Sequence, residues 1–249
     1  MMWNVFLSPP IFAGVAGAFM NSTLPGKIIV VILFLGSAWA WTIMLTKAAQ
    51  LRAGERASER FLRAFRAEPN PVALFTRRES FPDSPLYQIY EEGCRALGRE
   101  LQLTGIDPDD LLMGDMTSGR PRRLSRNRLE TIRAVVDRTV ADAALLLEDQ
   151  MGGLATAVSA APFLGLLGTV WGVMDAFSGM AKTGSAALSA VAPGISGALL
   201  TTIVGLLVAL PSMIGYNLLS GKIRRLAVQM DNFAQEFVTA IQNTYCENE

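Results

Sequence analysis

The chain has 249 residues, of which 51% are hydrophobic and 18% are charged, and its mean hydropathy is +0.32. This composition is more apolar than that of an average soluble domain and favours a membrane protein. Histidine is absent, which excludes catalytic triads and metal sites built on an imidazole ring. Basic and acidic residues are equal in number, so net charge gives no argument for nucleic-acid binding. We therefore expect no enzyme, no bound metal and no cofactor.

The N-terminal segment, residues 1–27, is apolar but is interrupted by Pro9 and Pro10. Residues 1–20 hold no lysine or arginine, so they lack the charged start of a cleaved signal peptide. The sequence predicts that this segment is retained and lies at the outer membrane interface as a short helix rather than as a span.

Three stretches are long and apolar enough to cross a bilayer. The first span is predicted over 28–46, where the uncharged residues from Ile28 to Leu45 rise about 27 Å as a helix. The second span is predicted over 151–177 and the third over 192–219, separated by a short turn at 178–191. We expect the third helix to begin at Pro193, because proline is well tolerated in a first helical turn.

The positions of the basic residues predict the orientation. Of the 22 lysines and arginines, 17 lie between Lys47 and Arg138 and three follow Gly221. Because cytosolic segments are enriched in lysine and arginine, residues 47–150 and the tail 220–249 are predicted to be cytosolic, with the N-terminus and the 178–191 turn outside. Cys94 and Cys246 then lie in a reducing compartment, and we expect free thiols.

The cytosolic segments have helical patterns. Residues 47–67 continue the first span as a charged helix until the prolines at 69 and 71, and Ser84 with Pro85 forms a good start for another helix. Apolar residues from Leu129 to Leu147 repeat at helical spacing, which predicts one helix that runs on through Gln150 into the second span. The expected fold is an all-α integral membrane protein with three transmembrane helices and a helical cytosolic domain.

The second and third spans carry small residues at helical spacing, which permits close helix packing. The candidate packing residues are Pro162, Gly165, Gly168, Gly172, Pro193, Gly194, Gly197 and Gly205. Thr169 and Thr202 fall at about 12 and 14 Å below the outer ends of the two antiparallel spans, so they sit at similar depth. With Thr201 they are candidates to line a proton path, although each hydroxyl could instead bond to its own helix backbone.

Neither span has an acid at mid-membrane depth, since Glu148, Asp149 and Asp175 lie near the ends. If the chain conducts protons, a partner must supply the acid.

Two charged stretches outside the spans are interpreted as ordinary loops and not as binding sites. The acidic run 107–115 has Leu112 where a calcium loop needs glycine, and the basic stretch 120–128 lacks the aromatics of an RNA site, so both are expected to be solvated loops.

A longer pattern is more specific than any of these features. Ala161 to Met174 has the sequence APFLGLLGTVWGVM, and it is followed by VAPGI at 191–195 and by 211–217. This order resembles the TolQ/ExbB/MotA proton-channel family, and the DNF tail at 231–233 looks more like its TolQ branch than its ExbB branch.

The resemblance implies a homopentamer in the bacterial inner membrane whose second and third spans enclose a TolR- or ExbD-like single-span subunit with one membrane aspartate. Thr169 and Thr202 match the pore threonines that face this aspartate. Proton flow would energise a TolA- or TonB-like protein, either for outer-membrane integrity and cell division in a Tol-Pal system or for TonB-dependent import. Gly197 stands where the family usually has a glutamate, and this departure favours the alternative of a non-conducting scaffold.

Overall fold

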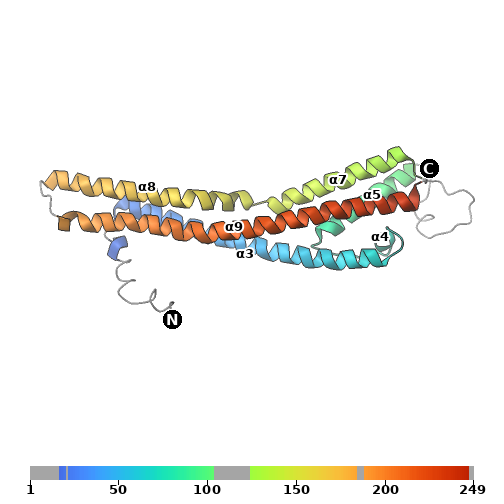
Figure 1. The fold of residues 1–249 in the computed structure, drawn as a ribbon, viewed down its shortest axis with the longest axis horizontal. Helices are drawn as coiled ribbons and strands as arrows, with labels where there is room; N and C mark the ends of the chain where they lie inside the picture. Colours follow the sequence, from blue (N-terminus) through green and yellow to red (C-terminus); the bar gives the residue numbers. More distant parts are fainter. Residues whose placement is uncertain (1–16, 21, 104–123, 184–187, 247–249) are drawn as a thin grey trace, which may run out of the picture. The chain divides into compact units, whose positions relative to one another are not determined.

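The computed structural model describes residues 17–20, 22–103, 124–183 and 188–246, and among them every regular element is a helix. The predictions for residues 1–16, for the acidic run 107–115 and for 120–123 lie outside the described residues. The helices are α3 (Leu24–Ala67), α4 (Ala73–Thr76), α5 (Pro85–Leu103), α7 (Arg126–Glu148), α8 (Met151–Thr183) and α9 (Leu188–Tyr245) (Figure 1). Three segments of the described chain, in α3, in the α7–α8 stretch and in α9, are long and apolar enough to span a membrane. The predicted fold class is confirmed.

The chain divides into two compact units. The first, which we call the span unit, comprises Met1–Thr46 and Gln150–Leu219, and the second, the polar unit, comprises Lys47–Asp149 and Ser220–Glu249. Helices α3 and α9 each contribute to both units. The assignment of the two units to membrane and cytosol remains a prediction from the distribution of charge.

The span unit has a small apolar core to which all three of its long helices contribute. Ile29 and Leu33 of α3 meet Ala161 of α8 and Val208 and Ala209 of α9 in a buried cluster. Large apolar side chains of all three helices instead point outward, as expected for surfaces that face lipid or another subunit. They include Phe34, Leu35, Phe163, Val170, Met174, Leu207 and Leu218.

The polar unit has an aromatic core. Phe61 of α3, Tyr90 of α5 and Phe233 and Phe237 of α9 are fully buried, and neighbouring rings in this cluster have centroids 5.3 to 6.1 Å apart. Gly93 lets α5 approach α9, since a Cβ there would overlap the Phe237 ring. Such edge-to-face and tilted ring contacts stabilise a core beyond the area that they bury.

Two helix ends in this unit confirm the sequence predictions. Helix α3 ends at Ala67, before the prolines at 69 and 71. Helix α5 begins at Pro85, and the Tyr87 amide donates a hydrogen bond to the Ser84 hydroxyl at 3.2 Å, which is the expected N-cap contact.

Two other boundaries differ from the predictions. The predicted continuous helix through Gln150 is interrupted, because Asp149 is extended and Gln150 takes a left-handed φ of 66° between α7 and α8. Glycines at 152 and 153 follow this break and have low helix propensity. Helix α9 begins at Leu188, so Pro193 lies inside the helix and not in its first turn as we expected.

Candidate functional site

Helices α8 and α9 approach each other most closely at glycines. A Cβ added to Gly165 would lie 2.8 Å from the Thr201 carbonyl oxygen, and one added to Gly205 would lie 2.6 Å from the Ala161 carbonyl oxygen. Gly168 faces the Thr201 side chain in the same way. Backbone contact at this distance leaves no room for a side chain, so these glycines set the spacing of the two helices.

Three threonine hydroxyls lie where the helices meet. The Thr169 and Thr202 oxygens are 2.5 Å apart, and the Thr169 and Thr201 oxygens are 3.4 Å apart. Thr201 is fully buried, whereas Thr169 and Thr202 keep partial exposure. The sequence-predicted residues of the candidate proton path are therefore brought together, and we call these three side chains the hydroxyl cluster.

The cluster is bonded across the helix pair as well as within each helix. Thr169 lies 3.0 Å from the Ala198 carbonyl of α9, and Thr201 and Thr202 lie 2.9 and 3.2 Å from the Gly165 carbonyl of α8. Thr201 also reaches the carbonyl of Ala198 in its own helix at 2.7 Å. Bonding to the local backbone, the alternative left open by the sequence, thus accounts for only part of these contacts.

The chemistry of the cluster follows from its donors and acceptors. Each hydroxyl has one proton and two lone pairs, so three protons are shared among three hydroxyls and two carbonyls. Oxygen lone pairs therefore remain available to accept a hydrogen bond from a water or a protonated acid. Within the described parts of α8 and α9 that belong to the span unit, the charged side chains are Asp175 and Lys182, both exposed and both past the cluster toward the end of α8. The cluster is polar but contains no titratable group of its own.

Gly197 has a different neighbour from the other packing glycines. A Cβ at this position would lie 2.9 Å from the Ser22 Cα and 3.0 Å from the Ala18 carbonyl oxygen. The backbone that precedes α3 therefore fills the space that a side chain at 197 would need. This explains in steric terms why the position holds glycine in this chain.

The remaining predicted packing residues have varied surroundings. Gly172 packs against Ala198, with 2.7 Å between an added Cβ and the Ala198 Cβ, and Gly194 packs less tightly against Ala176. Pro162 is partly buried inside α8, whereas Pro193 is exposed on α9. The sequence did not predict the two carbonyl acceptors, of Gly165 and Ala198. Small residues leave their backbone carbonyls accessible to a neighbouring helix, but no residue pattern shows which carbonyl is used.

The described residues contain no group of three or more potential metal ligands from histidine, cysteine, aspartate and glutamate. Cys94 and Cys246 are both free, as predicted. Burial raises the pKa of the Cys94 thiol and, to a smaller extent, that of Cys246. A buried neutral thiol of this kind is unreactive.

Known proteins with similar sequences share the region that contains the α8–α9 helix pair. Residues 108–232 match the model of the MotA/TolQ/ExbB proton channel family. The chain belongs to this family. It is 32% identical to the Tol-Pal system protein TolQ of Pseudomonas aeruginosa over 219 residues, which cover 87% of each chain. The family consists of membrane proton channels and is not a known family of enzymes.

Two further relatives come from the TolQ and the ExbB branches of this family. The Tol-Pal system protein TolQ of Haemophilus influenzae is 29% identical, over 90% of this chain and 91% of that protein. The biopolymer transport protein ExbB of Pseudomonas putida is also 29% identical, over 90% of this chain and 62% of that protein. The hydroxyl cluster lies inside the region that the family model covers.

Proposed function

We propose that this chain is a proton-conducting subunit that forms a ring, expected to be a homopentamer, in the bacterial inner membrane. The ring encloses a single-span TolR- or ExbD-like subunit whose membrane aspartate carries the proton past the hydroxyl cluster. Proton flow then drives a TolA- or TonB-like protein that acts on the cell envelope. The energy available is about 2.3 kcal/mol for each charge that crosses 100 mV.

The observation that carries this proposal is the hydroxyl cluster in a span unit without a mid-span acid. A threonine hydroxyl can accept a hydrogen bond from a neutral carboxylic acid and can donate one to a charged carboxylate. An isolated carboxylate in an apolar passage is costly, so such donors lower the barrier to its passage. Since α8 and α9 lack their own acid at this depth, the cluster needs one from another chain to act.

For the branch of the family, we propose a Tol-Pal role in outer-membrane integrity and cell division. The relative from Pseudomonas aeruginosa, named TolQ, supports this choice because the chains match over most of both lengths. The alternative is an ExbB-like role in TonB-dependent import. A single-span companion and a TolA-like or TonB-like protein encoded beside this chain would separate the two branches.

A second candidate function is a non-conducting scaffold, and the packing around Gly197 favours it. At this position the backbone at Ala18 and Ser22 occupies the space where relatives of this family are expected to carry a glutamate. A scaffold would keep the fold and the oligomer but would need no proton path. The hydroxyl cluster would then serve only to hold α8 against α9.

Replacing Thr202 by valine separates the two functions, because valine keeps the shape of threonine and removes the hydroxyl. In cells whose only copy is Thr202→Val, conduction predicts loss of outer-membrane integrity, measured as sensitivity to detergent, with the complex still assembled. Thr202→Ser should retain function. Thr156→Val is a matched control, since among the described residues the Thr156 hydroxyl has one hydrogen bond, to the Gly152 carbonyl of its own helix. Full integrity in Thr202→Val would favour the scaffold.

A further inference from the structure

One exposed face of α3 in the polar unit carries a row of arginines. Four arginines spaced three or four residues apart lie exposed along the middle of the outward face of this helix, and we call them the arginine ridge: Arg52, Arg56, Arg60 and Arg63. Within the described residues none of the four forms an ion pair. In the part of the chain that the structure describes, the side-chain hydrogen bonds of the ridge run to backbone carbonyls, from Arg60 to Arg56 and from Arg63 to Glu59.

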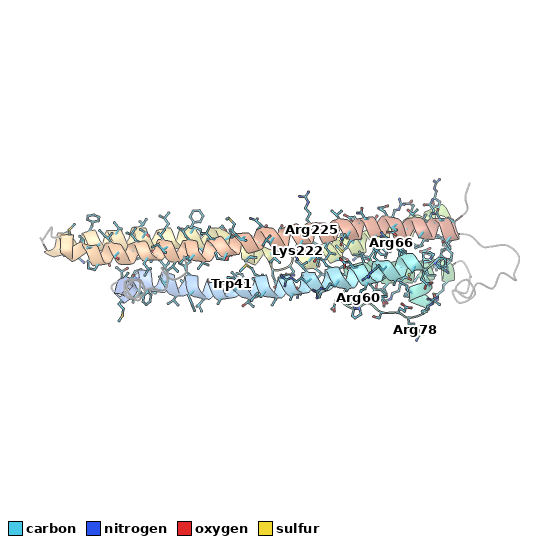
Figure 2. The ribbon with its side chains drawn as sticks, turned by 60° about the horizontal axis from the view of Figure 1, so that its bottom comes forward. Trp41, Arg60, Arg66, Arg78, Lys222 and Arg225 are labelled. Carbon is cyan, nitrogen blue, oxygen red and sulfur yellow. The ribbon has the colours of Figure 1, made fainter. Side chains whose placement is uncertain are left out.

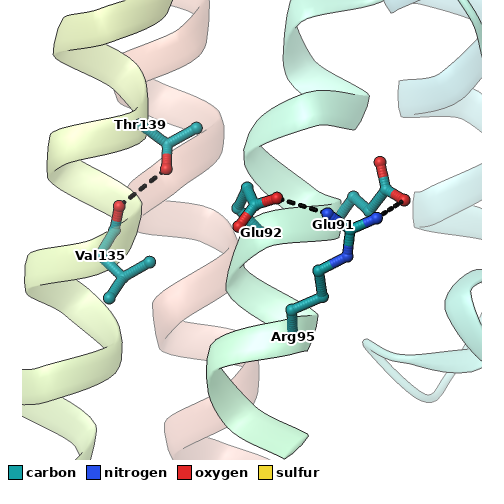
Figure 3. A network of polar contacts seen from close by, with 5 residues as sticks. All are labelled: Glu91, Glu92, Arg95, Val135 and Thr139. Carbon is teal, nitrogen blue, oxygen red and sulfur yellow. Dashed lines mark hydrogen bonds and ion pairs between the residues drawn. The ribbon is translucent and has the colours of Figure 1, made fainter. Parts of the chain in front are cut away.

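Some other arginines of the same unit are paired. Arg66 forms a two-pronged ion pair with Glu236 at 2.8 Å, and Arg95 binds both Glu91 and Glu92 on its own helix (Figure 3). Figure 2 shows Arg60 and Arg66 on the charged half of α3, of which only Arg66 has a carboxylate partner. Other arginines of this unit, Arg78, Arg224 and Arg225 among them, likewise form no ion pair within the described residues, so the ridge is defined by the alignment of its four side chains on one helix face.

Helix α7 carries a complementary acidic line. Glu130, Asp137 and Glu148 lie on one exposed face together with Ala134 and Ala141, and the exposed Arg126 precedes them on this face at the start of the helix. A different side of α7 packs into the unit through its five buried residues, Leu129, Ile132, Val136, Val140 and Ala143. Asp137 has no ion pair among the described residues, and Glu130 has only a 3.9 Å contact with Arg133.

The two surfaces are in register along the helices. The Lys47 ammonium donates to the Leu146 carbonyl at 3.4 Å, which fixes the relative height of α3 and α7 at this end of the polar unit. The helices run in opposite directions, because the segment before α7 pairs with the far end of α9, where the Leu124 amide donates to the Tyr245 carbonyl at 2.8 Å. Arg56 lies nine residues beyond Lys47 and Asp137 nine residues before Leu146, so both lie about 13 Å from this contact.

A second pair of basic and acidic residues is also aligned, further from the Lys47–Leu146 contact. Arg63 lies 16 residues beyond Lys47 and Glu130 16 residues before Leu146, about 24 Å from the fixed contact. Two basic and two acidic positions thus share two levels. Within one chain the described residues show no ion pair between the ridge and the acidic line, and both surfaces are exposed.

We propose that the arginine ridge of one copy binds the acidic line of the next copy, with Arg56 against Asp137 and Arg63 against Glu130. This inference rests on the proposed ring, since rotation about an axis normal to the membrane keeps every residue at its own level. The two surfaces differ, so the contact is of the head-to-tail kind that closes a ring. Complementary charge at matched levels sets the register of neighbouring subunits.

Charge exchange in the full-length protein tests the pairing. The variants Arg56→Glu and Asp137→Arg each place like charges at the interface, and we expect about fivefold more monomer than in the wild type, measured by native mass spectrometry from lipid nanodiscs at low salt. The double variant Arg56→Glu with Asp137→Arg should restore the wild-type fraction. The mismatched double variant Arg56→Glu with Glu130→Arg, whose charges lie at different levels, should not.

Disulfide trapping tests the same pairing independently, because it reports which positions of neighbouring subunits lie close together without any charge reversal. In a Cys246→Ser background, Arg56→Cys with Asp137→Cys should give a ladder of linked subunits on mild oxidation, and Arg56→Cys with Glu130→Cys should not. Cys94 is buried and should not interfere.

The possible results separate the inference from the proposed function. An oligomeric wild type with no rescue in the matched double variant and no matched disulfide ladder would overturn the ridge contact and leave the ring intact. A wild type that is monomeric in lipid would overturn the ring and the ridge contact together. Rescue by the mismatched variant would also overturn the proposed register.

Discussion

The two units of this protein bring helices together by opposite means. In the span unit α8 and α9 approach at glycines, with threonine hydroxyls bonded to carbonyls between them. In the polar unit α3, α5 and α9 meet through rings of Phe61, Tyr90 and Phe233. Because lipid tails are as apolar as leucine, burial of large side chains does not drive association within a bilayer, whereas it is the main driving force in water.

This contrast has a consequence for function. A core of fully buried aromatic side chains holds its helices firmly and leaves no polar group free. In the helix pair held by glycines and hydroxyls, the glycines are buried, but the Thr169 and Thr202 hydroxyls keep partial exposure and oxygen lone pairs that can accept a hydrogen bond. The span unit therefore leaves polar atoms that could contact another helix, whereas the polar unit is held by a packed aromatic core.

The largest expected effect is loss of an aromatic from the polar core. Phe61 is fully buried, and Phe61→Ala should destabilise the polar unit by about 3–5 kcal/mol. In the full-length protein, hydrogen exchange of the α5 amides should become much faster. Leu103→Ala, at a side chain that is 73% exposed, is the matched control and should change exchange little. Unchanged protection in Phe61→Ala would show that this core does not stabilise the unit.

A smaller effect is expected from one added methyl group in the span unit. Gly205→Ala places its Cβ 2.6 Å from the Ala161 carbonyl oxygen and 3.1 Å from the Gly165 Cα, so the helices must separate at a cost of about 1–3 kcal/mol. Thermal unfolding in detergent should report a lower midpoint. Gly36→Ala, with no neighbour within 4 Å of the added Cβ, should have no such effect. Equal midpoints for the two variants would contradict close packing of α8 on α9.

The smallest effect is a pH dependence confined to the polar unit. Burial raises the pKa of the Cys94 thiol above its unfolded value of about 8.5, so the folded state keeps a proton that the unfolded state releases. Stability should therefore be constant below about pH 8 and fall by about 1.4 kcal/mol by pH 9.5. Guanidinium unfolding of the full-length protein at the two pH values measures this change. Cys94→Ala should remove most of the dependence and leave the smaller part that comes from Cys246, whose thiol pKa is also raised by burial. An undiminished dependence in Cys94→Ala would assign it to another group.

Much of this architecture could be predicted from the sequence. Charge-free stretches located the three apolar segments, prolines at 69 and 71 marked the end of α3, and the Ser84 cap marked the start of α5. The break at Gln150 was not predicted, because the apolar repeat of α7 continues up to it and a single left-handed residue has no reliable sequence pattern.

The candidate site was predictable in its residues but not in its contacts. Equal depth on antiparallel helices brought Thr169 and Thr202 together, as helical rise alone implies. The contact of Gly197 with Ser22 depends on how the chain enters α3, and no periodicity encodes such an approach. Long-range packing of this kind is decided by tertiary structure and not by local propensity.

Proton flux through the reconstituted complex tests the central claim most directly. The chain and the proposed acidic single-span subunit would be placed in vesicles with an imposed potential, and internal pH would be followed for wild type, Thr202→Ser and Thr202→Val. We expect proton flux with the wild type and with Thr202→Ser, and no proton flux with Thr202→Val. The amount of assembled complex should be equal in all three. Wild-type flux in Thr202→Val would show that the hydroxyl cluster is not part of the proton path.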